Sequence, residues 1–417
     1  MKKTLFLAAL VLISTGCFAQ KNPLVKKAKN YAMASENPDF AAARAAISEA
    51  LEAEPTAENF YWAGMIGYQE LMQENYNQMM GKGVDQDKAG EAVEESYRYW
   101  LKADELAMIP TLDKKGREVV DTKTRNNINK KMLEYYKNLE LIKYGAYLGE
   151  KKSYEDAYHA FMLHLQIPEL PMMQSDKLQR EMPRDSSYNL YKYYAGAYAV
   201  QAELHQEAVA LLAEIKDGEI DPVFVNKLLF QEYLVIKDTA AGVAVLRDAI
   251  VRFPDDEWFV QSFVNVAIQT GREQEAVDYF TSLIERNPTD VLYYQKRGLM
   301  NELLERFDEA MADFDKAIEL DPNNADAYAG KGRLFYNKAA KMNEVANDIM
   351  DNKKFQKAFE EVQAVFRQSM PYFEKAHELD PTRESFLQTL KTLYYRFRSE
   401  PGMQEKYDAT TQLLESL

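Results

Sequence analysis

The side chains best suited to chemistry are four histidines, at positions 159, 164, 205 and 377. A helical zinc site needs two histidines four residues apart, so that both face the same ligand, and no pair here has that spacing. We therefore expect packed or surface histidines, and no bound metal.

Two loop-like segments resemble ion or phosphate sites, and each lacks a required residue. The run 85–90, DQDKAG, resembles the start of a calcium loop, but Ala89 stands at the fifth ligand position and Ser96 at the twelfth. The run 81–83, GKG, has neither the preceding glycine nor the following Ser or Thr of a phosphate loop. We expect neither calcium nor a nucleotide there.

Methionines and tyrosines leave two further alternatives. Met172, Met173 and Met182 could bind copper or fill gaps in a core. The tyrosines, dense between 135 and 198, could form a platform for sugar rings or fill the space between helices. Since no serine or cysteine nucleophile arrangement is discernible, the sequence predicts no catalysis and no cofactor.

The first residues indicate export. Two lysines precede an apolar stretch over 5–13 that is too short for a membrane-spanning helix, and Ala19 ends a plausible cleavage site. We therefore predict a signal peptide over 1–19 and a periplasmic mature chain. The alternative is an outer-membrane lipoprotein acylated at Cys17, which follows Thr15 and Gly16 as in a lipobox.

The composition of the chain argues against nucleic acid and anionic lipid as its partners. The chain has 417 residues, a formal charge of −15, and 47% hydrophobic residues, which suffice for a large core. The negative charge opposes binding to nucleic acid and to anionic lipid. With one cysteine in the whole sequence, no internal disulfide can form.

A period of 34 residues organises the second half of the chain. Pro254, Pro288 and Pro322 follow one another at that spacing, and each ends a helix-like run. In the clearest unit, small residues allow two helices to approach closely and aromatic residues fill the space around them. Its marker residues are Tyr294, Gly298, Ala310, Phe314, Ala317 and Pro322.

These residues resemble the tetratricopeptide-repeat (TPR) family. Equivalent residues recur in the neighbouring units: Ala276, Phe280, Pro288, Tyr328, Gly332, Phe373, Ala376 and Pro381, and more loosely Gly145, Phe161, Gly196 and Leu212. The clearest unit departs from the family pattern at Arg297 and Asn301, where Leu and Tyr are usual. The resemblance covers most of 25–417 and implies an all-α solenoid, a right-handed superhelix of stacked helix-turn-helix units.

The chain is expected to divide into a helical region over 21–167, a Pro- and Met-containing loop over 168–187, and a C-terminal array over 188–417. Elongated hairpins are expected around 74–95 and 338–364, because these inserts are charged and helix-prone. They could cap the array or offer a second docking surface.

The resemblance also places a groove on the first helix of each repeat. Its predicted lining residues are Tyr193, Lys227, Gln231, Gln261, Asn265, Gln295, Arg333 and Tyr336. Amides can donate and accept hydrogen bonds along an extended backbone, so we expect a scaffold that binds a protein or peptide. A solvated polar face is the plainer alternative, and a glycan-binding outer-membrane lipoprotein is the alternative function.

Overall fold

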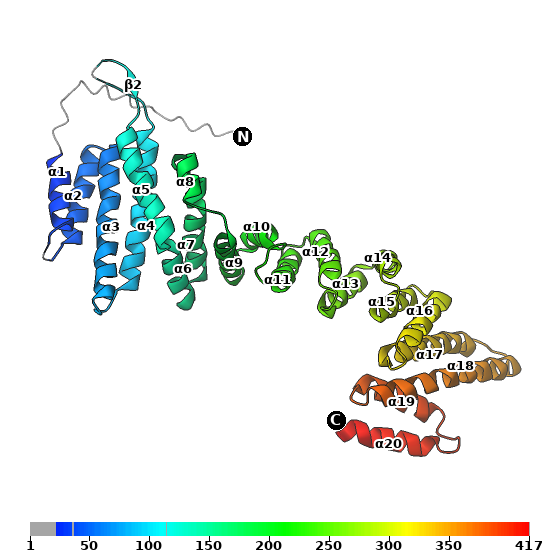
Figure 1. The fold of residues 1–417 in the computed structure, drawn as a ribbon. Helices are drawn as coiled ribbons and strands as arrows, with labels where there is room; N and C mark the ends of the chain where they lie inside the picture. The colour runs from blue at the N-terminus through cyan, green and yellow to red at the C-terminus, as the bar shows by residue number, and fades with distance from the viewer. Residues whose placement is uncertain (1–21, 36, 114, 417) are drawn as a thin grey trace. The chain divides into compact units, whose positions relative to one another are not determined.

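The computed structural model describes residues 22–35, 37–113 and 115–416, and these form two compact units, unit 1 and unit 2, divided between Val245 and Leu246. Over these residues the fold is all-α apart from one short hairpin of strands, as the sequence predicts (Figure 1). The signal peptide expected over 1–19, with Cys17, lies outside the described residues.

Unit 1 contains helices α1 to α11, two strands and two 3-10 turns, and the division between the units falls inside α12 (Thr239–Arg252). The elements of unit 1 are α1 (Pro23–Ala32), α2 (Phe40–Ala53), α3 (Ala57–Met79), α4 (Gln86–Ala107), β1 (Thr111–Leu112), β2 (Glu118–Val119), α5 (Thr122–Asn138), α6 (Glu140–Glu150), α7 (Tyr154–Gln166), η1 (Ile167–Glu169), η2 (Pro171–Met173), α8 (Asp176–Arg180), α9 (Ser186–Gln201), α10 (His205–Ile215) and α11 (Pro222–Val235).

Unit 2 consists of four consecutive helix pairs. They are α13 (Glu257–Thr270) with α14 (Glu273–Arg286), α15 (Val291–Leu303) with α16 (Phe307–Leu320), α17 (Ala325–Asn347) with α18 (Asn352–Leu379), and α19 (Glu384–Arg396) with α20 (Met403–Ser416). In each pair we call the earlier helix the first helix and the later one the second helix.

Local sequence sets the helix ends. Asn324 begins α17 as its N-cap, because its side chain accepts a hydrogen bond from the backbone N–H of Ala327 at 2.9 Å. Gly271 ends α13 in the left-handed conformation, at φ 65°, which glycine adopts without strain. Pro254, Pro288 and Pro322 follow the ends of α12, α14 and α16 by two residues, so the prolines that define the period stand where those helices have just ended.

Glycines on the first helices receive bulky residues from the second helices. A Cβ placed on Gly298 would lie 3.0 Å from the Phe314 ring, and one on Gly332 would lie 2.8 Å from the Phe373 ring. Such distances leave little or no room for a side chain. In unit 1, Gly145 packs against Phe161 and Gly196 against Leu212 in the same way. The glycines and bulky residues that the sequence relates to one another are therefore in contact.

Each unit contains one elongated hairpin, as predicted. Helices α3 and α4 have 23 and 22 residues, and α17 and α18 have 23 and 28. The regular helices α15 and α16 have 13 and 14. The inserts therefore lengthen each helix by about two to four turns.

The segment 168–187, expected to be a loop, packs as part of unit 1. It contains η2 and α8, and its methionines Met172, Met173 and Met182 are buried in one hydrophobic cluster with Tyr135 of α5. Burial among apolar side chains fits the gap-filling alternative for these methionines. The division between compact units falls later, between Val245 and Leu246.

Aromatic residues fill the interior of unit 1. Trp100 of α4 is fully buried, and its ring centroid lies 6.1 Å from that of Tyr68 and 5.1 Å from that of Tyr135. Its indole N–H donates to the backbone oxygen of Tyr61 at 3.3 Å, which satisfies the buried donor. For these tyrosines the structure supports a packing role.

Candidate functional site

The predicted groove residues fall on first helices in unit 2 and on two helices of unit 1. Unit 2 holds Gln261, Asn265, Gln295, Arg333 and Tyr336, on α13, α15 and α17. Unit 1 holds Tyr193 on α9, with Lys227 and Gln231 on α11. The two sets are described separately, because they belong to different compact units.

The amides of α13 start a polar chain that crosses to α15. Gln261 and Asn265 are exposed one turn apart, and the Gln261 amide donates to Asn265 Oδ1 at 2.9 Å. Lys296 Nζ, on α15, donates to Gln261 Oε1 at 3.1 Å. The Lys296 ammonium on α15 is thus hydrogen-bonded to a neutral amide on α13.

Lys296 is the strongest electrostatic feature of this face, and the sequence reasoning missed it. Burial lowers the pKa of the Lys296 ammonium, and the nearby Arg383 lowers it further. The carboxylates of Asp326 and Glu257 act in the opposite direction. Because desolvation penalises its charged form, this ammonium gains from any additional anionic or carbonyl acceptor.

A second link joins α15 to α17. The Arg333 guanidinium donates through Nε and Nη2 to the carboxylate of Glu302, with distances of 2.6 to 2.9 Å. The amide of Asn337 donates to the same carboxylate at 3.0 Å. Two parallel charge-assisted bonds fix the guanidinium plane, so Arg333 presents its remaining edge in a defined direction.

We call this set of side chains the first-helix face. It comprises Gln261, Asn265, Lys296, Glu302, Arg333 and Asn337. Glu302 and Lys296 were missed from the sequence because their partners lie in neighbouring repeats, 31 to 35 residues away, and are not visible within one 34-residue unit.

Two predicted groove residues have internal roles. The Gln295 amide donates to Asn324 Oδ1, the atom that caps α17, so Gln295 links one repeat to the start of the next. The Tyr336 ring packs edge-on against Phe366 of α18, with centroids 5.2 Å apart. Both side chains stabilise the stack of helices.

In unit 1 the predicted residues border exposed aromatic rings. The Tyr193 ring lies 5.5 Å from that of Tyr194 and 6.4 Å from that of Phe224 at the start of α11. Lys227 is half-buried and Gln231 is exposed, one turn apart on α11. The surface of α9 and α11 is therefore more aromatic than the first-helix face of unit 2.

The two departures from the family pattern form a buried polar network. Arg297 donates to both carboxylate oxygens of Asp313, the shortest distance being 2.6 Å, and Asn301 donates to Asp313 Oδ2 at 3.1 Å. Arg297 also donates to the hydroxyl of Thr281 at 3.1 Å, on the preceding repeat. These polar residues satisfy one another, which accounts for polar side chains at positions that are usually apolar.

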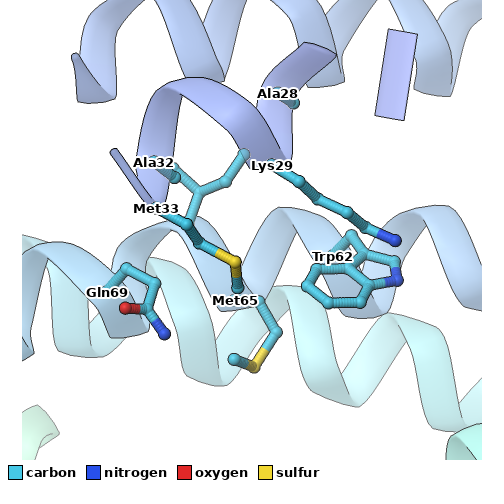
Figure 2. Close-up of a pocket in the computed structure, with 8 residues that line it drawn as sticks. Ala28, Lys29, Ala32, Met33, Trp62, Met65 and Gln69 are labelled. Atoms are coloured by element: carbon cyan, nitrogen blue, oxygen red, sulfur yellow. The ribbon is translucent and has the colours of Figure 1, made fainter. Parts of the chain in front are cut away.

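A small pocket near the start of unit 1 is not a ligand site. Figure 2 shows Lys29 reaching over Trp62, with Nζ 3.5 Å from the ring centroid. The pocket between them and Met33 has a volume of about 10 Å³. That volume holds one water molecule at most.

Within the described residues, no three His, Cys, Asp or Glu side chains converge to hold a metal ion. In the same part of the chain, no helix combines the length and apolarity that crossing a membrane requires.

Comparison with known proteins places the repeat in a family. The family model described as TPR repeat matches residues 303–338, from the end of α15 into α17. Human protein SGT1 homolog is 37% identical over 78 residues, which is 19% of this chain and 21% of that protein. Hsp70-Hsp90 organizing protein 3 of Arabidopsis thaliana is 38% identical over 60 residues, 14% of this chain and 11% of that protein.

A solved structure, a TPR repeats protein from Bacteroides fragilis, is 17% identical, with a TM-score of 0.36, and the match covers 62% of this chain and 97% of that one. The matched part of this chain spans about a fifth or less of the length of its curated relatives. The match identifies a tetratricopeptide repeat over 303–338, and similar helix pairs with glycine–aromatic contacts occur elsewhere in the chain.

Proposed function

We propose that this chain is an exported, non-catalytic scaffold that binds a partner protein or peptide through the first-helix face of unit 2. The supporting observation is a pair of polar links between first helices, Lys296 to Gln261 from α15 to α13 and Arg333 to Glu302 from α17 to α15. Amide, ammonium and guanidinium groups held in fixed positions suit a peptide backbone, which offers carbonyl acceptors at regular intervals.

The exposed members of the face are suited to contact with a partner. Gln261 and Asn265 are exposed, and Lys296 is half-buried beside them. Hydrogen bonds to a charged donor contribute more than those between neutral groups, about 1.5–3 kcal/mol each. A partner carbonyl or carboxylate at Lys296 would therefore contribute strongly to the affinity.

Site-specific photo-cross-linking tests the proposal. A photoreactive amino acid replaces Asn265 in the native cell, and the same amino acid replaces Gln274, an exposed residue of α14. We expect a discrete cross-linked partner from position 265 and none from position 274. Cross-linking of the same partner from both positions would contradict the assignment of the face.

Affinity for the identified partner gives the quantitative test. The triple substitution Gln261→Ala, Asn265→Ala and Arg333→Ala should weaken binding at least tenfold and leave the helical circular dichroism unchanged. A matched control replaces two exposed amides and one exposed arginine of second helices, Gln274, Gln356 and Arg286, and should bind as the wild type does.

Export is the second part of the proposal, and it rests on the composition of residues 1–19. Intact-mass analysis of the mature protein should give a chain that begins at Gln20. A mass that fits a diacylated or triacylated Cys17 would instead make the protein a lipoprotein, and an intact Met1 would contradict export.

A further inference from the structure

Unit 1 contains a ligand-sized cleft that is separate from the first-helix face. It lies between α3, α4 and α6, which are labelled in Figure 1, and its volume is about 320 Å³. Binding pockets for small molecules begin at about 300 Å³. The cleft is therefore large enough for a compact ligand of one or two functional groups.

One wall of the cleft is aromatic and held in place. The Tyr144 ring of α6 lies against the backbone of Gly90 of α4, where a Cβ would stand 1.9 Å from the ring, so only glycine leaves room for it there. Tyr147 follows one turn later, with its ring 6.5 Å from that of Tyr144. Next to Tyr147, Lys151 forms an ion pair of 2.7 Å with Asp87, which ties the end of α6 to the start of α4.

The buried carboxylate of the cleft is Glu140. Its side chain is 6% exposed and it stands at the first position of α6, where the helix dipole favours an anion. Burial raises the pKa of the Glu140 carboxyl, while Lys143 and a hydrogen bond from Asn75 lower it. Lys143 Nζ is 3.6 Å from the carboxylate, beyond hydrogen-bond distance, and its side chain is 64% exposed.

The surroundings of the cleft are acidic. Glu150 lies at its border, and the carboxylates of Glu94, Glu91 and Asp87 add to the burial that raises the pKa of Tyr144 to about 12. A buried carboxylate with one exposed counter-ion and further acids around it attracts a positive ligand. Aromatic rings beside the carboxylate favour the same charge.

We propose that this cleft binds a small organic cation, a primary ammonium or guanidinium group on a short apolar stem. The cationic group donates to the Glu140 carboxylate in place of Lys143, and the stem lies along Tyr144, Tyr147 and the apolar residues of α3 and α4. Lys143 can be displaced because its own side chain is 64% exposed and returns to water, while the incoming cation replaces its charge beside Glu140. The same chemistry could come from a free amine or from an Arg or Lys side chain of a peptide.

Isothermal titration of the full-length mature protein tests the proposal with agmatine, which carries a guanidinium and an ammonium group on a four-carbon stem. Glu140→Gln should weaken agmatine binding at least tenfold. Lys143→Gln should strengthen it several-fold, because it removes the competing ammonium. Glu49→Gln removes the same charge from an exposed residue of α2 that does not line the cleft, and should change the affinity less than twofold.

A merely structural role for Glu140 would not produce opposite effects at positions 140 and 143. If Glu140→Gln fails to fold, Ala146→Phe serves as the second variant, since Ala146 is exposed at the border of the cleft and a phenyl ring there would obstruct it. Loss of agmatine binding in that variant supports the proposal.

Two comparisons identify the source of the cation and complete the test. N-acetylarginine amide that binds as tightly as agmatine assigns the cleft to a protein side chain, and agmatine that binds at least tenfold more tightly assigns it to a free amine. Equal binding of agmatine to wild type and Glu140→Gln, or of neutral 1,4-butanediol and agmatine to the wild type, would overturn the proposal.

Discussion

In the elongated hairpin of unit 1, Trp100 fills the space between the two helices. In the elongated hairpin of unit 2, Phe373 has that position. A Cβ on Gly64 of α3 would lie 2.5 Å from the Trp100 ring, and one on Gly332 of α17 would lie 2.8 Å from the Phe373 ring. The packing device is therefore the same in both hairpins: a glycine on the first helix faces an aromatic ring on the second.

The two units differ in the polar groups that they bury. Among the described residues, ten polar or charged side chains are buried in unit 1 and four in unit 2. The ten include Glu70, which Arg44 and Lys88 hold at 2.5 and 3.2 Å, and His164, which lies among aromatic rings. Matched small and bulky residues are enough to form the helix pairs, and buried polar groups then make one unit more dependent on pH and on particular partners.

The largest effect is expected when the aromatic residue of each elongated hairpin is removed. Trp100→Ala should lower the free energy of unfolding by about 5 kcal/mol and Phe373→Ala by about 3 kcal/mol, within the range for buried aromatic residues. Trp100 loses more because its ring also contacts Tyr68 and Tyr135 and its N–H donates to a backbone oxygen. Urea unfolding followed by circular dichroism measures both, and equal losses would contradict the difference between the units.

The pH dependence of unit 1 should come in part from His164. Its ring stacks on Tyr136 at 4.7 Å, and neither ring nitrogen has a hydrogen-bond partner within the described part of the chain. Burial lowers the pKa of His164 from 6.5 to about 4. The unfolded chain therefore binds a proton more readily, so the stability that the neutral ring provides is complete above pH 6.5 and is lost as the pH falls towards 4.

Between pH 7 and pH 5, protonation of His164 should lower the free energy of unfolding by about 2 kcal/mol. Comparing wild type with His164→Phe isolates the contribution, because the raised pKa of Glu140 acts in the opposite direction and is present in both proteins. Urea unfolding at the two pH values should show a smaller loss in the variant. An identical loss in both proteins would mean that His164 gains a proton without cost.

The glycine contacts provide a finer comparison. Gly64→Ala should destabilise the protein by about 1–2 kcal/mol, because the strain of an overpacked core exceeds the gain of about 1 kcal/mol from alanine in a helix. Gly298→Ala should change stability by less than about 0.5 kcal/mol, since its Cβ would meet the Phe314 ring at 3.0 Å, where a small shift of the ring suffices. The thermal midpoints of the two variants test this order.

These contacts also show which parts of the helix packing can be predicted from the sequence. Gly298 and Phe314 are 16 residues apart, as in a regular 34-residue unit, and were paired without coordinates. Gly64 and Trp100 are 36 residues apart, and the sequence does not predict this pair, although it relates Gly332 to Phe373 across the other elongated hairpin. The hairpin of β1 and β2 was missed as well, since its two-residue strands are exposed and carry no hydrophobic alternation.

The candidate site was predicted less completely than the fold. Family positions led to Gln261, Asn265 and Arg333, but not to the acceptor Glu302 or the half-buried Lys296. Position within a repeat determines which way a side chain points. Its partner depends on how the next repeat stacks, and a single-repeat pattern does not contain that information.

The smallest effect is expected at the distal end of the unit 2 hairpin. Val345 and Met350 are 70% and 98% exposed, so replacing both with serine should change the free energy of unfolding by less than about 0.5 kcal/mol. Deeper in the same hairpin, Val362 is buried, and Val362→Ala should cost about 1–3 kcal/mol. Thermal unfolding of both variants measures the contrast. If the serine variant keeps its stability but loses affinity for the cross-linked partner, the exposed apolar end is a second docking surface; if it loses stability, the end caps the helix stack.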